Sequence, residues 1–323
     1  MLATLVIVQV MSVFEGQKRA TTGTADAQTN GQISLYNIGR EVQLAGYPLM
    51  PAGLAGAADS PLECTTTTFG ATGITSISPL TITDGGAGGS DTVAIRYGNS
   101  AAGGVPTTIT GAAVGNAVPV DSNFGCQVND MTFITNGSTC AMSSVTAISA
   151  PTAKTVTLQN VTNVAAGADL SCLGAWSTFT YAVNNGNLQR NGVDSVAGIV
   201  NLQAQYGVSA SANSNQITQW VNASGGTWAA PTVANRNRIK AIRIAVVARN
   251  SKLEPNAVTA ACDAVNFTGL CAWQDVPVGG AITVASPAPL IDLSADANWA
   301  RYRYRVYETI IPLRNMIWSK DTL

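Results

Sequence analysis

Cysteine is the residue type in this chain whose number and spacing predict covalent chemistry. No two cysteines form a C-x-x-C pair, which leaves zinc ribbons, thioredoxin-type redox motifs and c-type haem attachment without support. An even number in loop-like sequence is typical of disulfides made in an oxidising compartment. The six residues are Cys64, Cys126, Cys140, Cys172, Cys262 and Cys271.

The number of cysteines allows many pairings, and the spacing favours short loops. We predict Cys262 with Cys271 and Cys126 with Cys140, and by elimination Cys64 with Cys172. The alternative for some of them is a buried free thiol, since free cysteine behaves as a small apolar residue.

Carboxylates are the next candidates for chemistry. The segment Asp84–Asp91 holds two aspartates and four glycines and is similar to one copy of a calcium-binding nonapeptide. Such sites are built by stacking repeats, so a flexible turn is the favoured interpretation. No Gly-Lys-Ser/Thr follows, as a phosphate-binding loop would require. Other loop aspartates are interpreted as solvated or turn-capping rather than calcium-binding; they are Asp263, Asp275, Asp292 and Asp296. We therefore predict no metal and no cofactor.

The chain contains no histidine. Histidine-based general-base catalysis, histidine metal ligation and the serine triad are thereby excluded. Neither a G-x-S-x-G elbow nor an S-x-x-K motif occurs. The sequence predicts no catalytic residue and a protein that is not an enzyme.

The tryptophans have two interpretations: an aromatic platform for sugars or peptides, or packing in cores and interfaces. Packing is favoured because large aromatic side chains bury so much area. The six are Trp176, Trp220, Trp228, Trp273, Trp299 and Trp318.

Charge is sparse over the 323 residues: 11% are charged, and the formal net charge is −1. A protein that binds nucleic acid mainly through phosphates needs clustered Lys and Arg, so no nucleic-acid partner is predicted.

The chain begins with an almost purely apolar run, Leu2–Phe14. As a helix this run is about 20 Å long, short of the roughly 20 residues needed to cross a bilayer. It lacks the basic start and cleavage site of a secretion signal. Lys18 and Arg19 follow where a membrane helix would reach the interface. We therefore expect a helix whose first turns lie upstream of Met1.

The same helix is expected to continue to residue 47. Leu35, Ile38, Val42 and Ala45 recur at helical spacing on one stripe. Gly46 is a candidate C′ residue and Pro48 a stop. Four interior glycines are expected to weaken the helix, each by about 1 kcal/mol relative to alanine; they are Gly16, Gly23, Gly31 and Gly39.

From about Pro51 the sequence is rich in Thr, Ser, Gly and Asn with β-branched runs, typical of strands. Asn184–Gly186 predicts a hairpin turn. Tyr302, Tyr304 and Val306 alternate with Arg301, Arg303 and Arg305, which predicts a strand with one packed and one wet face. We predict an α+β fold: residues 1–47 as helix and 48–323 as a β-rich head with antiparallel sheets and long loops. The expected strands are 92–97, 131–135, 155–158, 178–183, 199–206, 239–249 and 302–309.

Several blocks resemble the PilW family of type IV pilus minor pilins, in the family's order. They are Gly31–Tyr47 at the end of the long helix, Asn187–Arg190 with Gly198–Gly207, Arg238–Arg249 and Tyr302–Asn315. The family's basic leader, its cleaved glycine and the glutamate at the fifth mature position have no counterpart, because Met1 falls inside the apolar run. Glu15 lies at the far end of that run and does not match this glutamate.

The resemblance implies a pilin-like subunit that, with other minor pilins and beneath a tip protein, primes pilus assembly, with twitching motility, adhesion and DNA uptake as outcomes. It implies residence in the bacterial inner membrane before assembly and in an extracellular pilus afterwards. An apolar helix on a disulfide-linked head is expected to bury its surface in lipid or against other copies. Two alternatives stay open: the main repeating subunit of a filament, and a tip adhesin. The residues expected at helix–helix contacts are Leu2, Leu5, Val6, Val8, Val10, Met11, Val13 and Phe14.

Overall fold

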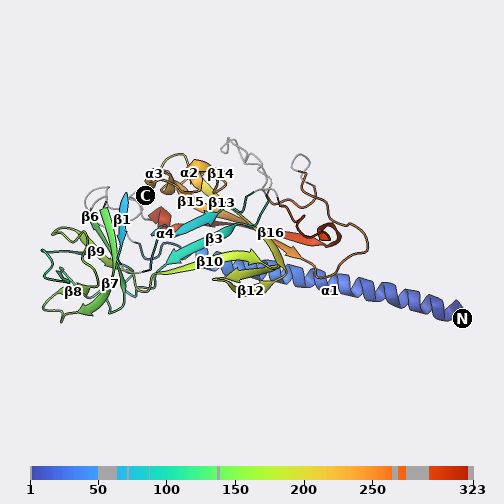
Figure 1. Cartoon of the computed structure of the whole chain (residues 1–323), viewed down its shortest axis with the longest axis horizontal. Coiled ribbons are helices and arrows are strands. Elements are labelled where there is room, and N and C mark those ends of the chain that lie inside the picture. The colour runs from blue at the N-terminus through green and yellow to red at the C-terminus, as the bar shows by residue number, and fades with distance from the viewer. Residues whose placement is uncertain are drawn as a thin grey trace.

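The computed structural model describes most of the chain. The described residues are 2–49, 64–70, 73–86, 88–136, 139–263, 268–273 and 291–318. One long helix lies along antiparallel sheets, and its N-terminal end extends past them (Figure 1). This is the α+β arrangement that the sequence predicts.

Helix α1 spans Leu2–Val42 and ends earlier than predicted. Hydrogen-bonded turns follow, with the Leu44 N–H donating to the Glu41 carbonyl at 2.9 Å. Gly46 has φ +80°, the left-handed conformation expected at a helix end. Asn315 donates its side-chain N–H to the Ala45 carbonyl at 3.1 Å. Asn315, from near the other end of the chain, thus holds the turns that follow the helix, while the last helix carbonyls accept from N–H groups of the turns themselves.

Two open antiparallel sheets form the part of the head that contacts α1. The four-stranded sheet has the order β14 (Ile217–Val221), β13 (Ile199–Ser209), β15 (Ile239–Arg249), β16 (Tyr304–Pro312). The five-stranded sheet has the order β12 (Val193–Ala197), β11 (Asn187–Arg190), β10 (Ser177–Asn184), β3 (Thr92–Tyr97), β2 (Leu80–Thr83). The predicted hairpin is confirmed: Asn185 and Gly186, both with positive φ, join β10 to β11.

A third sheet closes on itself. Its six main strands are β4 (Thr107–Thr108), β9 (Asp169–Cys172), β6 (Met131–Asn136), β7 (Thr139–Ile148), β8 (Thr155–Leu158) and β5 (Ala117–Pro119). Ile109 and Val120 pair directly after β4 and β5 and join the two ends of the sheet. We call this closed unit the barrel. β1 (Thr66–Phe69) pairs with β7 from outside, in parallel.

The barrel is inserted between two neighbouring strands. β3 ends at Tyr97 and β10 starts at Ser177, and these two residues are paired in the five-stranded sheet. The chain therefore leaves and re-enters the sheet at one point, and Asn99 and Leu173 are hydrogen-bonded at the base. Figure 1 shows the barrel at the end of the molecule opposite to the start of α1.

Short helices complete the described elements: α2 (Gly225–Trp228), α3 (Val233–Arg236), η2 (Trp299–Arg301) and α4 (Arg314–Trp318). All seven predicted strand regions contain strands, although the last begins at Tyr304. The sequence predicted one packed face and one wet face for this strand, but both faces are packed over part of its length. Tyr304 and Val306 pack against one core, while Tyr307 and Ile311 on the opposite face pack beneath α1.

The disulfide pairing differs from the prediction at two of three bonds. Cys262–Cys271 is present as expected, but the other bonds are Cys64–Cys140 and Cys126–Cys172. The reason is strand alternation, because neighbouring side chains on a strand point to opposite faces. Cys140 on β7 points out of the barrel into a cluster with Cys64, whereas Cys126 and Cys172 lie in the barrel interior. Cys140, the cysteine nearest to Cys126 in sequence, therefore lies on the opposite face of the sheet and cannot pair with it.

Candidate functional site

The N-terminal part of α1 projects beyond the head (Figure 1). Ile7, Met11 and Phe14 follow one another at spacings of four and three residues and are 58%, 66% and 70% exposed, and Val10 beside them is also exposed. Four apolar side chains on one side of a free helix form a surface that water disfavours. We call it the apolar end. The side chains of the other predicted contact residues lie outside the described part: Leu2, Leu5, Val6, Val8 and Val13.

Among the helices of the described residues, none combines the length and apolar character needed to cross a membrane.

The following part of α1 is docked on the head by one buried stripe. Its buried positions recur every three or four residues from Gly23 onward: Gly23, Ala27, Gly31, Ser34, Ile38 and Val42. Ile38 and Val42 are fully buried, as their helical spacing predicts. Ser34, also fully buried, donates its hydroxyl to the Asn30 carbonyl at 2.8 Å, so no polar group of this side chain is left unsatisfied.

Glycines are what allows close approach of α1 to the sheet. A Cβ added to Gly31 would overlap the ring of Tyr307 on β16, and one added to Gly23 would overlap the Asn250 side chain. At Gly39 an added Cβ would lie 3.6 Å from Ile311 Cδ1, an ordinary contact. These positions were predicted to weaken the helix, yet α1 is continuous through them. Their cost in helix propensity is offset by packing that a larger residue would prevent.

Near its C-terminal end α1 is held by polar contacts to the five-stranded sheet. Arg190 on β11 forms an ion pair with Glu41 at 2.6 Å and lies over the Phe179 ring at 4.1 Å. Tyr181 donates its hydroxyl to the Asn37 carbonyl at 3.4 Å. Burial, reinforced by the Glu41 charge, raises the pKa of Tyr181 far above its ordinary value, so this hydroxyl stays protonated and remains a donor.

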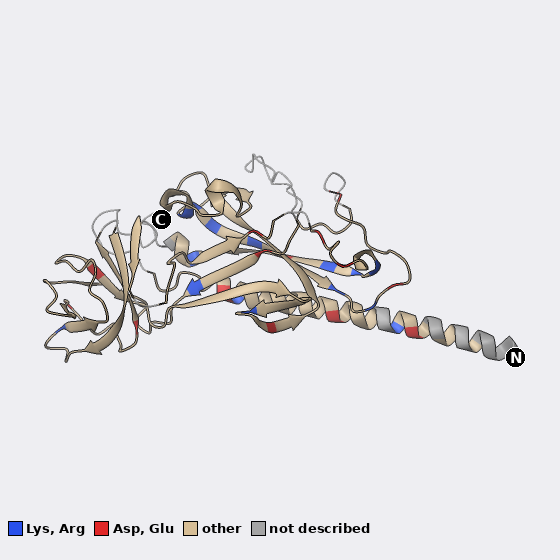
Figure 2. Cartoon of the chain, viewed as in Figure 1, with Lys and Arg blue, Asp and Glu red and all other residues tan. Residues whose placement is uncertain are grey.

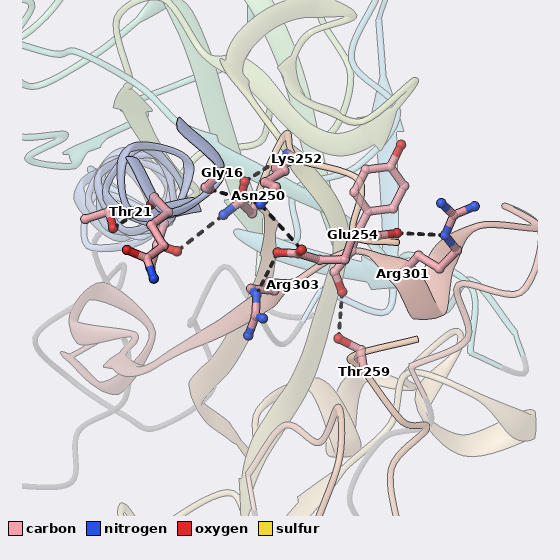
Figure 3. A network of polar contacts seen from close by, with 11 residues as sticks. Gly16, Thr21, Asn250, Lys252, Glu254, Thr259, Arg301 and Arg303 are labelled. Carbon is pink, nitrogen blue, oxygen red and sulfur yellow. Dashed lines mark hydrogen bonds and ion pairs between the residues drawn. The ribbon is translucent and has the colours of Figure 1, made fainter. Parts of the chain in front are cut away.

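A second polar cluster holds α1 where it leaves the head (Figure 3). Lys252 donates its ammonium to the Gly16 carbonyl at 3.0 Å and pairs with Glu254 at 3.5 Å. Arg303 also pairs with Glu254, at 3.0 Å. Asn250 donates to the Thr24 hydroxyl at 3.3 Å. The Arg303 hydrogen bond lowers the pKa of Glu254, so its carboxylate remains charged at neutral pH.

The glycine-rich segment Asp84–Asp91 is docked rather than free in its described part. The Asp91 N–H donates to the Leu202 carbonyl, and the two Asp91 carboxylate oxygens accept from Gly85 N at 2.9 Å and Ala204 N at 2.7 Å. Gln203 donates its amide to the Gly89 carbonyl at 2.7 Å. The described part of the segment is thus held by hydrogen bonds to Asn201–Ala204 of β13.

Asp91 provides a pH-dependent prediction. Burial raises its pKa from 3.8 to about 6. The folded state therefore retains a proton that the unfolded state releases, and this group's contribution to stability falls as pH rises from about 4 to above 6. The interval corresponds to at most about 3 kcal/mol. In urea unfolding, the stability difference between wild type and Asp91→Asn should shrink by that order across this range. A difference independent of pH would contradict the prediction.

Three tryptophans are buried, as favoured from sequence: Trp176, Trp220 and Trp273. The side chain of Trp318 lies outside the described part. Trp220 and Trp273 are nearly buried on either side of the Arg243 guanidinium, 4.9 and 4.4 Å from its carbon. Neither is available as an open binding platform. Asp292 and Asp296 accept from Ser294 N and Asn298 N, which is the turn-capping role.

The distribution of charge is uneven over the molecule. Lys and Arg occur around β16 and along the open sheets, whereas the barrel carries few charged residues (Figure 2). Over residues 98–176 the charged side chains are Asp121, Asp130, Lys154 and Asp169.

The molecule is thus an α+β protein with a long helix docked on antiparallel sheets and an exposed apolar end. Residues 170–315 match the family model of PilW, type IV pilus-assembly protein W, and this match supports a protein of the PilW family. This match relates residues 170–315 to type IV pilus assembly, and a pilus-assembly family implies other pilus components as partners and a location at the cell envelope or surface. No curated protein and no solved structure matches the chain significantly.

The matched range includes β10 to β16 and excludes α1 and nearly all of the barrel. Sequence reasoning missed two sets of contacts: the glycine side of α1 and the polar cluster around Lys252. The glycines did carry a signal, because Gly16, Gly23, Gly31 and Gly39 recur every seven or eight residues and therefore share one side of a helix. Lys252 and Asn250 carried none, since their partners are more than 200 residues away.

Proposed function

We propose that the chain is a pilin-like structural subunit that assembles through its N-terminal helix into a type IV pilus, as a minor pilin that primes assembly. The observation that carries the proposal is the apolar end of α1, projecting from a head to which the rest of the helix is firmly docked. The match of residues 170–315 to PilW supports the same function. Before assembly the apolar end lies in the inner membrane, and in the filament it packs against helices of neighbouring subunits.

The docking of α1 supports separate roles for its two parts: the stripe from Gly23 to Val42 binds the head, and the apolar end is left for assembly. The stripe from Gly23 to Val42 is already buried against the head, so it cannot also form the shared helix bundle. The apolar end has no such cover among the described residues, and burying it in lipid or against other helices removes about 25 cal/mol per Å² of unfavourable exposure. Exchange of lipid for helix contacts then allows a subunit to leave the membrane as the filament grows.

Substitution of the apolar end tests the proposal. Met11→Asp and Phe14→Asp each place a charge in a dry helix bundle, at about 3 kcal/mol per subunit, and should abolish filaments while the head keeps its melting temperature. The residues Leu5 and Val8 are expected to behave in the same way. Val114→Asp is the matched control, because Val114 is 82% exposed on the barrel. Normal filament numbers with Met11→Asp would refute assembly through this helix.

Electron microscopy of the same filaments separates the two stoichiometries. An antibody against the barrel should label one end of each filament if the subunit primes assembly. Labelling along the entire length would instead identify the main repeating subunit.

A further inference from the structure

A cavity of about 610 Å³ lies between the glycine-rich segment and the end of β14. Its volume is within the range of small-molecule sites, which is about 300–1,000 Å³. It lies at the end of the four-stranded sheet opposite to β16, the strand beneath α1 (Figure 1). We call it the polar pocket, and the polar side chains among its described lining residues are Thr83, Asp84, Asp91, Gln203, Asn222 and Ser224.

Gln203 on β13 is the best-defined side chain of the polar pocket, and it is only 6% exposed. Its amide donates to the Gly89 carbonyl at 2.7 Å and to Asn201 Oδ1 at 2.8 Å. These oxygens only accept, so the two bonds fix the orientation of the amide and use its N–H groups. Gln203 Oε1 has no hydrogen-bond partner among the described residues. An acceptor held in a nearly buried side chain is satisfied by what occupies the cavity.

Three further side chains of the polar pocket add donors and acceptors. Asp84 accepts the Gly86 N–H at Oδ1, at 2.7 Å, which leaves Oδ2 without a partner among the described residues. Asn222 accepts from Gln205 at Oδ1, which leaves its amide N–H groups as donors. The Ser224 hydroxyl makes no cap bond to the short helix that follows it. Carboxylate and amide acceptors are thus presented together with amide and hydroxyl donors.

The remaining lining of the polar pocket disfavours an anion. Ile82, Ala223 and Ala229 supply apolar surface, and neither lysine nor arginine occurs among the described lining residues. An anion would therefore meet the Asp84 charge without a cation to compensate for the repulsion.

A calcium ion is also a poorer occupant than a larger neutral molecule. Calcium takes about six to eight oxygen ligands, and carboxylates are prominent among them. Both Asp91 oxygens already accept N–H groups, so Asp84 is the one carboxylate with an unused oxygen among the described lining residues. The cavity is moreover far larger than a single ion.

A sugar fits this combination of groups, because each of its hydroxyls both donates and accepts. A polyhydroxylated ring can donate to Asp84 Oδ2 and Gln203 Oε1, accept from Asn222, and place its C–H faces on the apolar part of the wall. We propose that the polar pocket binds a neutral saccharide unit, either a free sugar or the end of a glycan. This binding goes beyond the proposed function and does not depend on it, since no described lining residue belongs to α1.

Saturation-transfer NMR on the full chain tests the binding. The probes are methyl glycosides of glucose, galactose, mannose and N-acetylglucosamine with their oligosaccharides, and the detergent must have no sugar headgroup. Wild type should transfer saturation to at least one of them. Ala229→Trp should abolish the signal, because an indole at this exposed position fills the cavity. Ala230→Trp is the matched control: it adds the same side chain at an exposed neighbour outside the described lining and should keep the signal.

Asp84→Asn tests the hydrogen bonding without filling the cavity. Asparagine keeps the acceptor for the Gly86 N–H and removes the charge, so the affinity for the sugar should fall about tenfold, as loss of a charge-assisted hydrogen bond does. An unchanged affinity would contradict the assignment of Asp84. The melting temperature of each variant checks that the head is folded.

Other outcomes overturn the proposal in distinguishable ways. Binding of no saccharide by wild type removes it and leaves the proposed function intact. A signal that survives Ala229→Trp places the sugar elsewhere on the molecule. Terbium luminescence that Asp84→Asn abolishes, in the absence of any sugar signal, assigns the cavity to a metal cation instead. Equal binding of a methyl glycoside and its oligosaccharide identifies a free sugar, whereas tighter binding of the oligosaccharide identifies a glycan end; both results support the site.

Discussion

Replacing Cys126 and Cys172 together by alanine is expected to lower the stability of the barrel by about 4 kcal/mol. The bond joins residues 46 apart, and the loss of stability from opening a loop of that length is of this order. Both side chains are buried in the barrel interior, so the alanine substitutions also remove packing there that water cannot replace. The corresponding change at Cys262 and Cys271, which close a loop of nine residues near the surface, is expected to cost about 2.5 kcal/mol.

Loss of the Cys126–Cys172 bond is expected to destabilise the barrel without destabilising the rest of the head. Its core is separate from the core beneath α1, and the chain enters and leaves it between β3 and β10. Hydrogen exchange should therefore show loss of protection in β6 to β9 while β15, β16 and the docked part of α1 stay protected. A variant in which α1 loses protection together with the barrel would show that the two are one cooperative unit.

Replacing Gly31 by alanine is expected to destabilise the head by about 1–3 kcal/mol, even though alanine is the better helix former by about 1 kcal/mol. The new methyl group would overlap the Tyr307 ring, which is packed against the core beneath α1. Either the ring leaves its position or α1 moves away from β16. Denaturant unfolding measures the loss, and faster proteolysis within α1 would show that the helix is what has loosened.

Gly39→Ala is the matched control on the same helix face. Its added methyl group would make only an ordinary contact with Ile311, so it should be neutral or stabilising by up to about 1 kcal/mol. The double variant Gly31→Ala with Tyr307→Leu should recover part of the lost stability by removing the overlap. Equal stabilisation by the two glycine variants would mean that α1 is not as close to Tyr307 as the structure has it.

The sequence predicted what depends on neighbours along the chain. The stripe of Ile38, Val42 and Ala45 is local periodicity, and the structure buries all three. The β-branched runs became strands, and Asn185 with Gly186 formed the expected turn because only a few residues tolerate positive φ. The apolar run at the start was likewise visible without tertiary information.

What failed depends on long-range pairing. The disulfide prediction used sequence distance, but the register of β6 with β7 places Cys140 on the outer face of the barrel. Closure of the barrel through Ile109 and Val120 is a single pairing with no sequence signal. The wet face predicted for the arginine row is confirmed at Arg303 and Arg305, but the sequence does not show that α1 covers the same face farther along β16, at Tyr307 and Ile311. Each failure concerns which surfaces meet, and local patterns do not determine this.

The insertion of the barrel has a mechanical consequence. If the proposed function holds, a subunit in the filament is pulled at one end through α1 and at the other end through the barrel. A force on the barrel is transmitted to the head through both β3 and β10, which leave the sheet side by side, and through the Cys64–Cys140 bond as a third covalent path. Tension between the barrel and the head is thereby shared among three covalent connections instead of one.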